Sequence, residues 1–274
     1  MTSTTQLKDK PFIARFRADI LWMLEPFVHY GRTLEDTRKS KLIVEPCAVG
    51  GCMIIGVNSH GMAIFRDPEG SCSTSAAINI PCDAFPACEP NRSINLKYCN
   101  NSYDVPLPSW AQPDEVWVYD SGMFVTTKMR HPDWADQDHE FQPVLFQRTA
   151  MPEGIRDLDH DYFVESEIGL NWRKPLSRLE QQQPIKVELI SINPSVLSLY
   201  ERIHGRITEQ RQQGTLFHVT ILGDDENRCD GLLLEIDETP DFFGVCMPMR
   251  GPCAPAKIPE WATKRVHDAP GERQ

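Results

Sequence analysis

Apolar residues recur at three- and four-residue intervals near the start of the chain. The five residues with this spacing are Ile13, Phe16, Ile20, Leu24 and Phe27. Such spacing places side chains on one face of an amphipathic helix. Pro26 is expected to kink or end that helix. The opposite face would carry Arg15 and Asp19, with Arg17 nearby.

The pattern then changes to short stretches rich in Val, Ile and Met between residues 41 and 65. Gly50-Gly51 and residues 58–61 interrupt them as turns, which predicts successive antiparallel strands. Further short strands are expected at 93–98, 115–119 and 123–129, and a short helix starting near Asp83.

The second half begins with a polar segment, 131–183, in which only short apolar runs occur. A strand is expected at 185–192. Asn193 and Pro194 then form the start of a helix, because Asn caps helices and Pro suits the first helical position. Its buried stripe is expected to comprise Val196, Tyr200, Ile203 and Ile207, with Arg202 and Arg206 on the other side. Strands are predicted at 216–222, 231–237 and 242–249.

Both halves therefore combine helix with many short antiparallel strands, which is an α+β organisation. The chain has 274 residues, 41% hydrophobic and 24% charged. This composition is typical of a globular protein, and no apolar run is long enough to span a membrane.

The start of the sequence lacks a secretory pattern, so a cytoplasmic location is expected. The nine cysteines are interpreted as thiols in the core. Structural zinc at Cys47 and Cys52 is the less favoured alternative.

The formal net charge of −11 limits the ways in which the chain can contact nucleic acid. Binding through an extensive basic surface is disfavoured, because that surface needs clustered Lys and Arg to replace counterions on phosphates. A protein that encircles a duplex needs only a thinly basic inner surface. The charge therefore weakens the case for one kind of DNA binding and permits another.

Three separated segments resemble the bacterial DNA polymerase III beta sliding clamp, in its middle and C-terminal domains. IIGVNSHGMAIF is similar to the clamp's ATDGHRLAV, with His60 on its His and Met62 on its Leu. FVTTKMRHPDW resembles an FTSKL strand followed by RFPDY, with Pro132 and Trp134 on its Pro and Tyr. GVCMPMR is similar to the terminal VVMPMRL. The three segments also occur in the same order as in the clamp.

The resemblance implies an α+β fold of two DNA-clamp-like domains, each with antiparallel sheets and one or two helices. The expected parts are an N-terminal extension at 1–11, a domain like the clamp's middle domain at 12–130, a junction at 131–143, a domain like its C-terminal domain at 144–250, and an extended or disordered tail at 251–274.

In the clamp family the three segments meet between two domains as a cleft for a short clamp-binding peptide. Met, Val and Pro side chains suit the Leu and Phe anchors of such a peptide, because thioethers adapt their shape. The alternative is that these residues only complete two cores. The residues carried over to the cleft are Val57, His60, Gly61, Met62, Pro132, Trp134, Val245, Met247, Pro248, Met249 and Arg250.

The first functional hypothesis is a clamp-like processivity factor for DNA replication, encoded by a phage or mobile element. Two domains per chain would close a six-domain ring around double-stranded DNA if three copies associate. Its partners would be a DNA polymerase, a clamp loader or other proteins with clamp-binding motifs. The pore-facing charges would be Arg15, Arg17, Arg202 and Arg206, for which a solvated helix face is the alternative.

The second hypothesis keeps the cleft without the ring, as a binding module or decoy that captures clamp-binding proteins or modulates a host clamp. Two departures from the family favour it. VNSHG replaces TDGHR, which removes an acidic residue and an arginine. No clear amphipathic helix is found between Trp134 and Ile185, where a clamp domain carries its first helix.

The third hypothesis is a metal-dependent hydrolase, since carboxylates and imidazoles bind divalent metals and activate water. The residues concerned are His131, Asp133, Asp138, His139, Asp159, His160 and Asp161. They lack a fixed ligand spacing such as HExxH, and a solvated loop explains them equally. No nucleophile elbow or phosphate-binding glycine motif occurs either. We therefore expect no enzyme activity, no metal and no cofactor.

Overall fold

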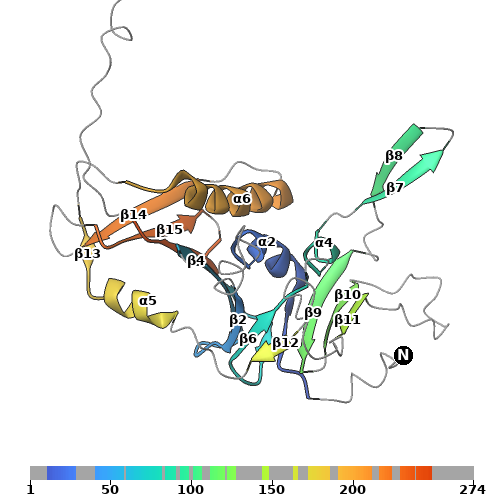
Figure 1. Cartoon of the computed structure of the whole chain (residues 1–274), viewed down its shortest axis with the longest axis horizontal. Coiled ribbons are helices and arrows are strands. Elements are labelled where there is room, and N and C mark those ends of the chain that lie inside the picture. Colours follow the sequence, from blue (N-terminus) through green and yellow to red (C-terminus); the bar gives the residue numbers. More distant parts are fainter. Residues whose placement is uncertain are drawn as a thin grey trace, which may run out of the picture.

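The computed structural model describes about three fifths of the chain, in two sheets, a separate hairpin and four helices (Figure 1). The described residues are 11–28, 41–58, 60–81, 84–90, 93–98, 101–106, 112–120, 122–127, 144–147, 163–165, 172–185, 191–211, 216–223, 229–237 and 239–248. The helices in this part are α2 (Ala18–Val28), α4 (Ala84–Ala87), α5 (Arg173–Leu179) and α6 (Pro194–Arg211).

The larger sheet has nine strands within the described residues, and all its pairings are antiparallel. In spatial order these are β12 (Phe163–Glu165), β6 (Ala76–Asn79), β2 (Lys41–Pro46), β3 (Cys52–Val57), β4 (Gly61–Asp67), β16 (Phe242–Cys246), β15 (Gly231–Ile236), β14 (Phe217–Gly223) and β13 (Gln183–Pro184). Strands from both halves of the chain therefore form one sheet, in which β4 of the first half pairs with β16 of the second half.

The smaller sheet has five described strands and is also antiparallel. Its order is β11 (Val144–Gln147), β10 (Gly122–Thr127), β9 (Pro113–Tyr119), β1 (Ala14–Arg17) and β5 (Ser71–Cys72). Strands β7 (Ser93–Tyr98) and β8 (Asn101–Pro106) pair as a separate hairpin. These sheets and the helices confirm the predicted α+β class.

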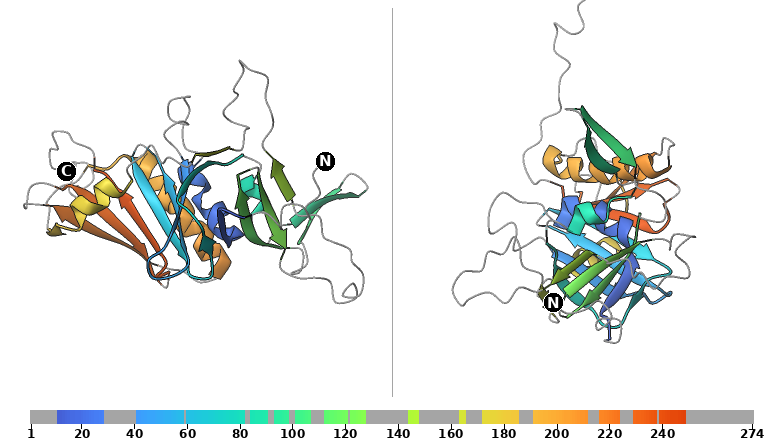
Figure 2. Two further views of the ribbon diagram at one scale, coloured as in Figure 1. Left: turned by 90° about the horizontal axis from the view of Figure 1, so that it is seen from below. Right: turned by 90° about the vertical axis from the view of Figure 1, so that its right-hand side faces the viewer.

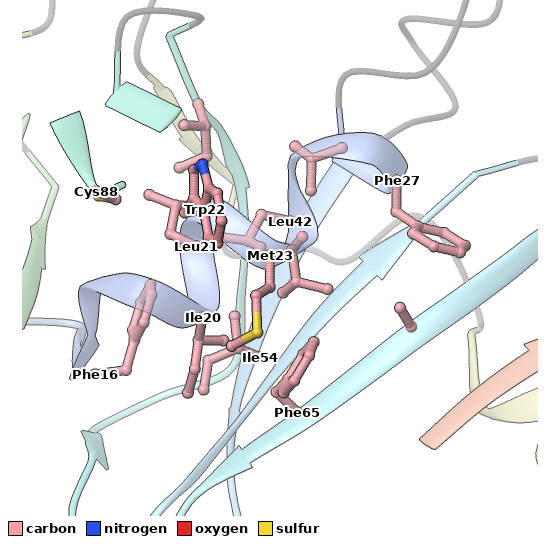
Figure 3. Close-up of a cluster of buried hydrophobic side chains, with 14 of the residues drawn as sticks. Phe16, Ile20, Leu21, Trp22, Met23, Phe27, Leu42, Ile54, Phe65 and Cys88 are labelled. Atoms are coloured by element: carbon pink, nitrogen blue, oxygen red, sulfur yellow. The ribbon is translucent and has the colours of Figure 1, made fainter. Parts of the chain in front are cut away.

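Helix α2 packs between the two sheets. It contacts β3 and β4 of the larger sheet, β9 of the smaller sheet, and α6. The buried side chains around it include Phe16 of β1 and Ile20 of α2, and Ile20 points toward Ile54 of β3 (Figure 3). Since Trp22 and Met23 are buried as well, α2 is enclosed on nearly all sides, as expected of a helix that is apolar all round.

The prediction that one helix includes residues 13–17 is wrong. Residues Ala14–Arg17 form strand β1, which pairs with β9 along its full length and with β5 at Ala14 and Arg15. In β1, burial alternates from residue to residue, with Ala14 and Phe16 inward. Phe16 and Ile20 fit a helical spacing only because a strand residue and a helix residue happen to enter the same core. The backbone hydrogen bonds to β9 determine the strand conformation.

The hairpin between β2 and β3 confirms the predicted glycine turn. Gly50 and Gly51 have φ angles of 95° and 79°, which side chains with a Cβ rarely adopt. The Cys47 amide donates to the Gly51 carbonyl oxygen at 3.1 Å and closes the turn. The predicted strands on either side are therefore correct, as are those at β4, β7, β9 and β10.

The start of α6 also agrees with the prediction. The Asn193 Oδ1 accepts a hydrogen bond from the Ser195 amide at 2.9 Å, and Pro194 is the first helical residue. The expected buried stripe of Val196, Tyr200, Ile203 and Ile207 is confirmed, with each residue at most 3% exposed. The strands expected after α6 are β14, β15 and β16.

Helices α2 and α6 lie on one face of the larger sheet, and α5 lies on the other (Figure 2). The predicted strand at 185–192, the junction at 131–143 and the tail at 251–274 fall mostly or wholly outside the described residues, so the division into two domains stays a prediction. No helix in the part of the chain that the structure describes is both long and apolar enough to span a membrane.

Candidate functional site

Two of the three segments singled out in the sequence lie side by side in the larger sheet. Met62 of β4 pairs with Val245 of β16, and Gly61 pairs with Cys246. The Met247 amide extends the pairing by donating to the His60 carbonyl oxygen at 3.2 Å. We call this pairing of residues 60–65 with 242–247 the seam.

The turn that brings His60 to the seam is organised by Asn58. Its side-chain Oδ1 accepts hydrogen bonds from the amides of His60 and Gly61, at 2.9 and 3.0 Å. The Asn58 amide donates to the Gly61 carbonyl oxygen at 3.1 Å. Asn is favoured in such turns because its side chain replaces a backbone acceptor. The NSHG sequence thus places the His60 side chain at the surface, where it is exposed.

A row of four apolar side chains crosses the seam on the face opposite α6. Val57 of β3 pairs with Met62, Met62 with Val245, and Val245 with Leu233 of β15. Residues directly opposite in adjacent strands lie on the same face. These four residues, Val57, Met62, Val245 and Leu233, are called the apolar row below.

The short helix α5 packs against the apolar row. Trp172, Leu176 and Leu179 belong to the same hydrophobic cluster as the four row residues. Leu179 also lies against Gly231, where an added Cβ would come within 2.6 Å of the Leu179 Cδ2. As a result Val57 and Met62 are each only 5% exposed, and Val245 is 1% exposed.

The predicted cleft residues therefore fall into an exposed group and a covered group. His60 and Met247, which is 39% exposed, lie at the surface at the end of the seam, and Pro248 is half-buried beside them. Val57, Gly61, Met62 and Val245 are buried. The remaining predicted members, Pro132, Trp134, Met249 and Arg250, lie outside the described residues.

Tyr200 of α6 reaches the seam from the opposite face. Its hydroxyl donates to the Val245 carbonyl oxygen at 2.6 Å and lies 3.2 Å from the Met62 carbonyl oxygen. Burial raises the pKa of Tyr200 well above its ordinary value, which further favours the protonated, hydrogen-bond-donating form of this hydroxyl.

Two glycines make the space for the Tyr200 side chain. An added Cβ at Gly61 would lie 2.6 Å from the Tyr200 hydroxyl oxygen, and one at Gly244 would lie 2.4 Å from its Cε1. Both distances are too short for a real contact. Glycine inside a strand often marks such a close approach. The seam and helix α6 are therefore fitted to each other.

The four candidate pore arginines do not form one basic surface. The expectation that Arg15 and Arg17 lie on a helix is wrong, because both belong to β1. Arg15 lies 3.5 Å from Glu115, and Arg17 lies 3.1 Å from Asp19. Their charges are thus partly balanced by neighbouring carboxylates.

The other two candidates are on α6, as predicted. Arg206 is directed at α2, where its guanidinium pairs with Glu25, donates to the Trp22 carbonyl oxygen and stacks 4.4 Å from the Trp22 ring centroid. Arg202 is exposed. Arg206 therefore joins two helices, and only Arg202 of this pair faces solvent.

The acidic and histidine-rich residues of the hydrolase hypothesis, His131, Asp133, Asp138, His139, Asp159, His160 and Asp161, lie outside the described residues. Among the residues that the structure does describe, no group of three or more His, Cys, Asp or Glu side chains could hold a metal ion. The six described cysteines are free thiols, and three of them, Cys52, Cys88 and Cys246, are buried. Burial raises the pKa of Cys246, which lies in the seam, to about 11.

Sequence reasoning missed two features of the site. Helix α5 was not expected, although Trp172, Leu176 and Leu179 have the spacing of one helix face. Tyr200 was assigned to the core without a role for its hydroxyl. The pattern that would have indicated that role is the presence of Gly61 and Gly244 inside otherwise apolar strands.

No family model matches this chain. No curated protein matches it either. A search of solved structures returns DNA polymerase III beta subunits at high probability but with low TM-scores. The one from Borrelia burgdorferi, in complex with a natural product, has a TM-score of 0.36 at 9% identity, covering 91% of this chain and 69% of that one.

Two further beta subunits give similar values. The one from Streptococcus pyogenes has a TM-score of 0.32 at 10% identity, over 92% of this chain and 67% of that one. The Pseudomonas aeruginosa sliding clamp, bound to griselimycin, has a TM-score of 0.33 at 13% identity, over 91% of this chain and 68% of that one.

Proposed function

We propose that this chain is a clamp-like binding protein that docks short clamp-binding peptides of DNA replication proteins at the seam. The observation that carries the proposal is the register of β4 and β16. The segment around His60 and the segment around Met247 were singled out by sequence resemblance alone, and they are adjacent in the sheet.

The side chains at the seam suit a peptide with Leu and Phe anchors. Met247 offers an unbranched, polarizable side chain that adapts to such anchors, and Met62 lies deeper, in the apolar row. The exposed imidazole of His60 supplies a polar group at the rim, which would fix the direction of the peptide. An apolar surface with a few polar groups at its edge is typical of peptide recognition.

The proposal does not depend on a ring around DNA. Helix α2 contains no Lys or Arg, and nearly all its residues are buried. Arg206 is engaged with α2, which leaves Arg202 as the solvent-facing one of the two candidate arginines on α6. With a net charge of −11, these helices offer little attraction for a duplex. These observations favour the non-ring module over the processivity ring.

Peptide docking is tested by fluorescence polarization with a labelled clamp-binding peptide and the Met247→Asp variant. A charge at the exposed end of the seam would have to be desolvated beneath an apolar anchor. We expect the affinity to fall at least about tenfold, which corresponds to about 1.4 kcal/mol.

The matched control is Val49→Asp, because Val49 is 72% exposed and lies in the distant β2–β3 hairpin. The control should bind like the unmodified protein. Absence of binding, or equal losses in both variants, would overturn the proposed function. Retention of the protein on circular but not on linearised DNA would instead restore the ring hypothesis.

A further inference from the structure

We propose that residues 172–182, which comprise α5 and the residues on either side of it, form a displaceable strap that occupies the peptide site from within the same chain. This inference rests on the proposed function, because it concerns which residues block that site and how they are released. A partner peptide would reach the apolar row only after the strap has left it.

The position of α5 is the first observation. Its apolar side chains cover Met62 and Val245, the two row residues that are paired directly across the seam. Both are nearly inaccessible, whereas Met247 at the end of the seam is exposed. A peptide bound as the proposed function requires would therefore begin at Met247 and then compete with Trp172, Leu176 and Leu179 for the same face.

Two polar attachments hold the strap, one at each end. At its start, the Trp172 Nε1 donates to the Glu45 Oε1 at 2.8 Å, and Arg173 pairs with the same carboxylate. At its end, Asp230 accepts hydrogen bonds from Arg178 at 2.7 Å and from Gln182 at 2.8 Å. Glu45 belongs to β2 and Asp230 precedes β15, so α5 extends across the seam between them.

The strap has little helical stability of its own. Helix α5 has only seven residues, includes Pro175, lacks an acidic residue in its first turn and has no side-chain cap at Trp172. Isolated helices of this length do not form stably in water. The conformation of α5 therefore depends on its contacts with the sheet, so releasing those contacts also releases the helix.

Substitution of Arg173 and Arg178 should weaken the attachment of the strap to the sheet. The side chains of Glu45 and Asp230 are only 10% and 3% exposed. Without Arg173 and Arg178, both carboxylates would lose a charged partner, and they would regain water when α5 moves away. The apparent affinity of a partially blocked site equals the intrinsic affinity multiplied by the fraction of molecules that are open. Loosening the strap should thus tighten peptide binding.

The experiment compares the full chain with the double variant Arg173→Ala, Arg178→Ala in fluorescence polarization with the labelled peptide. We expect the variant to bind about tenfold more tightly, because the strap keeps the open form a minor species in the unmodified protein. Arg66→Ala is the matched control, because it removes the Arg66–Asp241 ion pair at the other end of β4. The control should leave peptide affinity unchanged.

Hydrogen exchange of the unmodified protein tests the same inference without a substitution. Saturating peptide should increase exchange at the amides of residues 176–182 and decrease it at β16. If the peptide binds but α5 keeps its protection, or if the double variant binds equally or more weakly, the strap inference is wrong while the proposed function stands. If neither protein binds the peptide, the proposed function itself fails.

Discussion

At the scale of single residues, one side chain links helix α6, on one face of the larger sheet, to the seam within that sheet. Tyr200 belongs to α6 on one face, and its hydroxyl bonds the Val245 carbonyl oxygen within the seam. The helical spacing of residues 196–207 predicted its burial correctly. Spacing cannot predict the partner of a buried hydroxyl, because that partner lies on a strand far away in the sequence.

The Tyr200→Phe variant tests this connection. The ring would still fill the space left by Gly61 and Gly244, but the buried hydrogen bond to Val245 would be lost. We expect the free energy of unfolding to fall by about 1–2 kcal/mol, measured by chemical denaturation, with no change in the denaturant slope. A variant as stable as the unmodified protein would show that the hydroxyl contributes nothing at the seam.

At the scale of elements, local signals predicted α6 well and α5 poorly. Helix α6 has a cap, a proline at its first position and a regular apolar stripe, so that each local preference favours the same structure. Helix α5 is short, carries Pro175 and depends on the sheet beneath it. A helix of this kind is determined by tertiary contacts, which a single sequence does not reveal.

For strand β1 the error is the reverse, because a helix was predicted where the structure has a strand. Its residues match a helical spacing with those of α2, yet Ala14–Arg17 pair with β9. A strand followed directly by a helix places apolar residues from both into one core, here beside β2 and β3. Spacing alone does not distinguish that arrangement from a longer helix. The pore role of Arg15 and Arg17 depended on this helix and loses its basis with it.

The Asn193→Ala variant tests whether the cap predicted from the sequence stabilises α6. Loss of the hydrogen bond from the Ser195 amide should lower the free energy of unfolding by about 1 kcal/mol. Asn193→Asp should remain close to the unmodified protein, because Asp is an equally good cap. Equal losses in both variants, in denaturation followed by circular dichroism, would assign the effect to something other than capping.

At the scale of the whole molecule, the sequence resemblance identified the segments that meet, but local patterns did not predict the pairing. The resemblance implied that residues near Met62 and Met247 converge, and the structure pairs β4 with β16. Local periodicity could not predict this, since the register of distant strands depends on the whole sheet. Helix α5, which packs on the apolar row, has no counterpart in the matched motifs, and therefore only the structure revealed it.

The shared sheet should make the two halves unfold together. Strands from both halves contribute to one hydrophobic cluster, in which α2 and α6 also contact each other. The Gly244→Val variant tests this coupling. Its Cβ would lie 2.4 Å from the Tyr200 ring and 3.5 Å from the Leu234 Cβ, so the seam and α6 would have to move apart. Overpacking of this kind typically costs about 1–3 kcal/mol.

Hydrogen exchange gives the measurement strand by strand. In the Gly244→Val variant, amides of β2 and β3 should lose as much protection as those of β14 and β15, because opening of the seam exposes the common core. Gly205→Ala is the matched control. Nothing lies within 4 Å of its added Cβ in α6, so it should preserve or slightly raise stability. If Gly244→Val reduces protection only in β14 and β15, the halves are independently stable. The seam would then be an interface between two separate units and not the centre of one sheet.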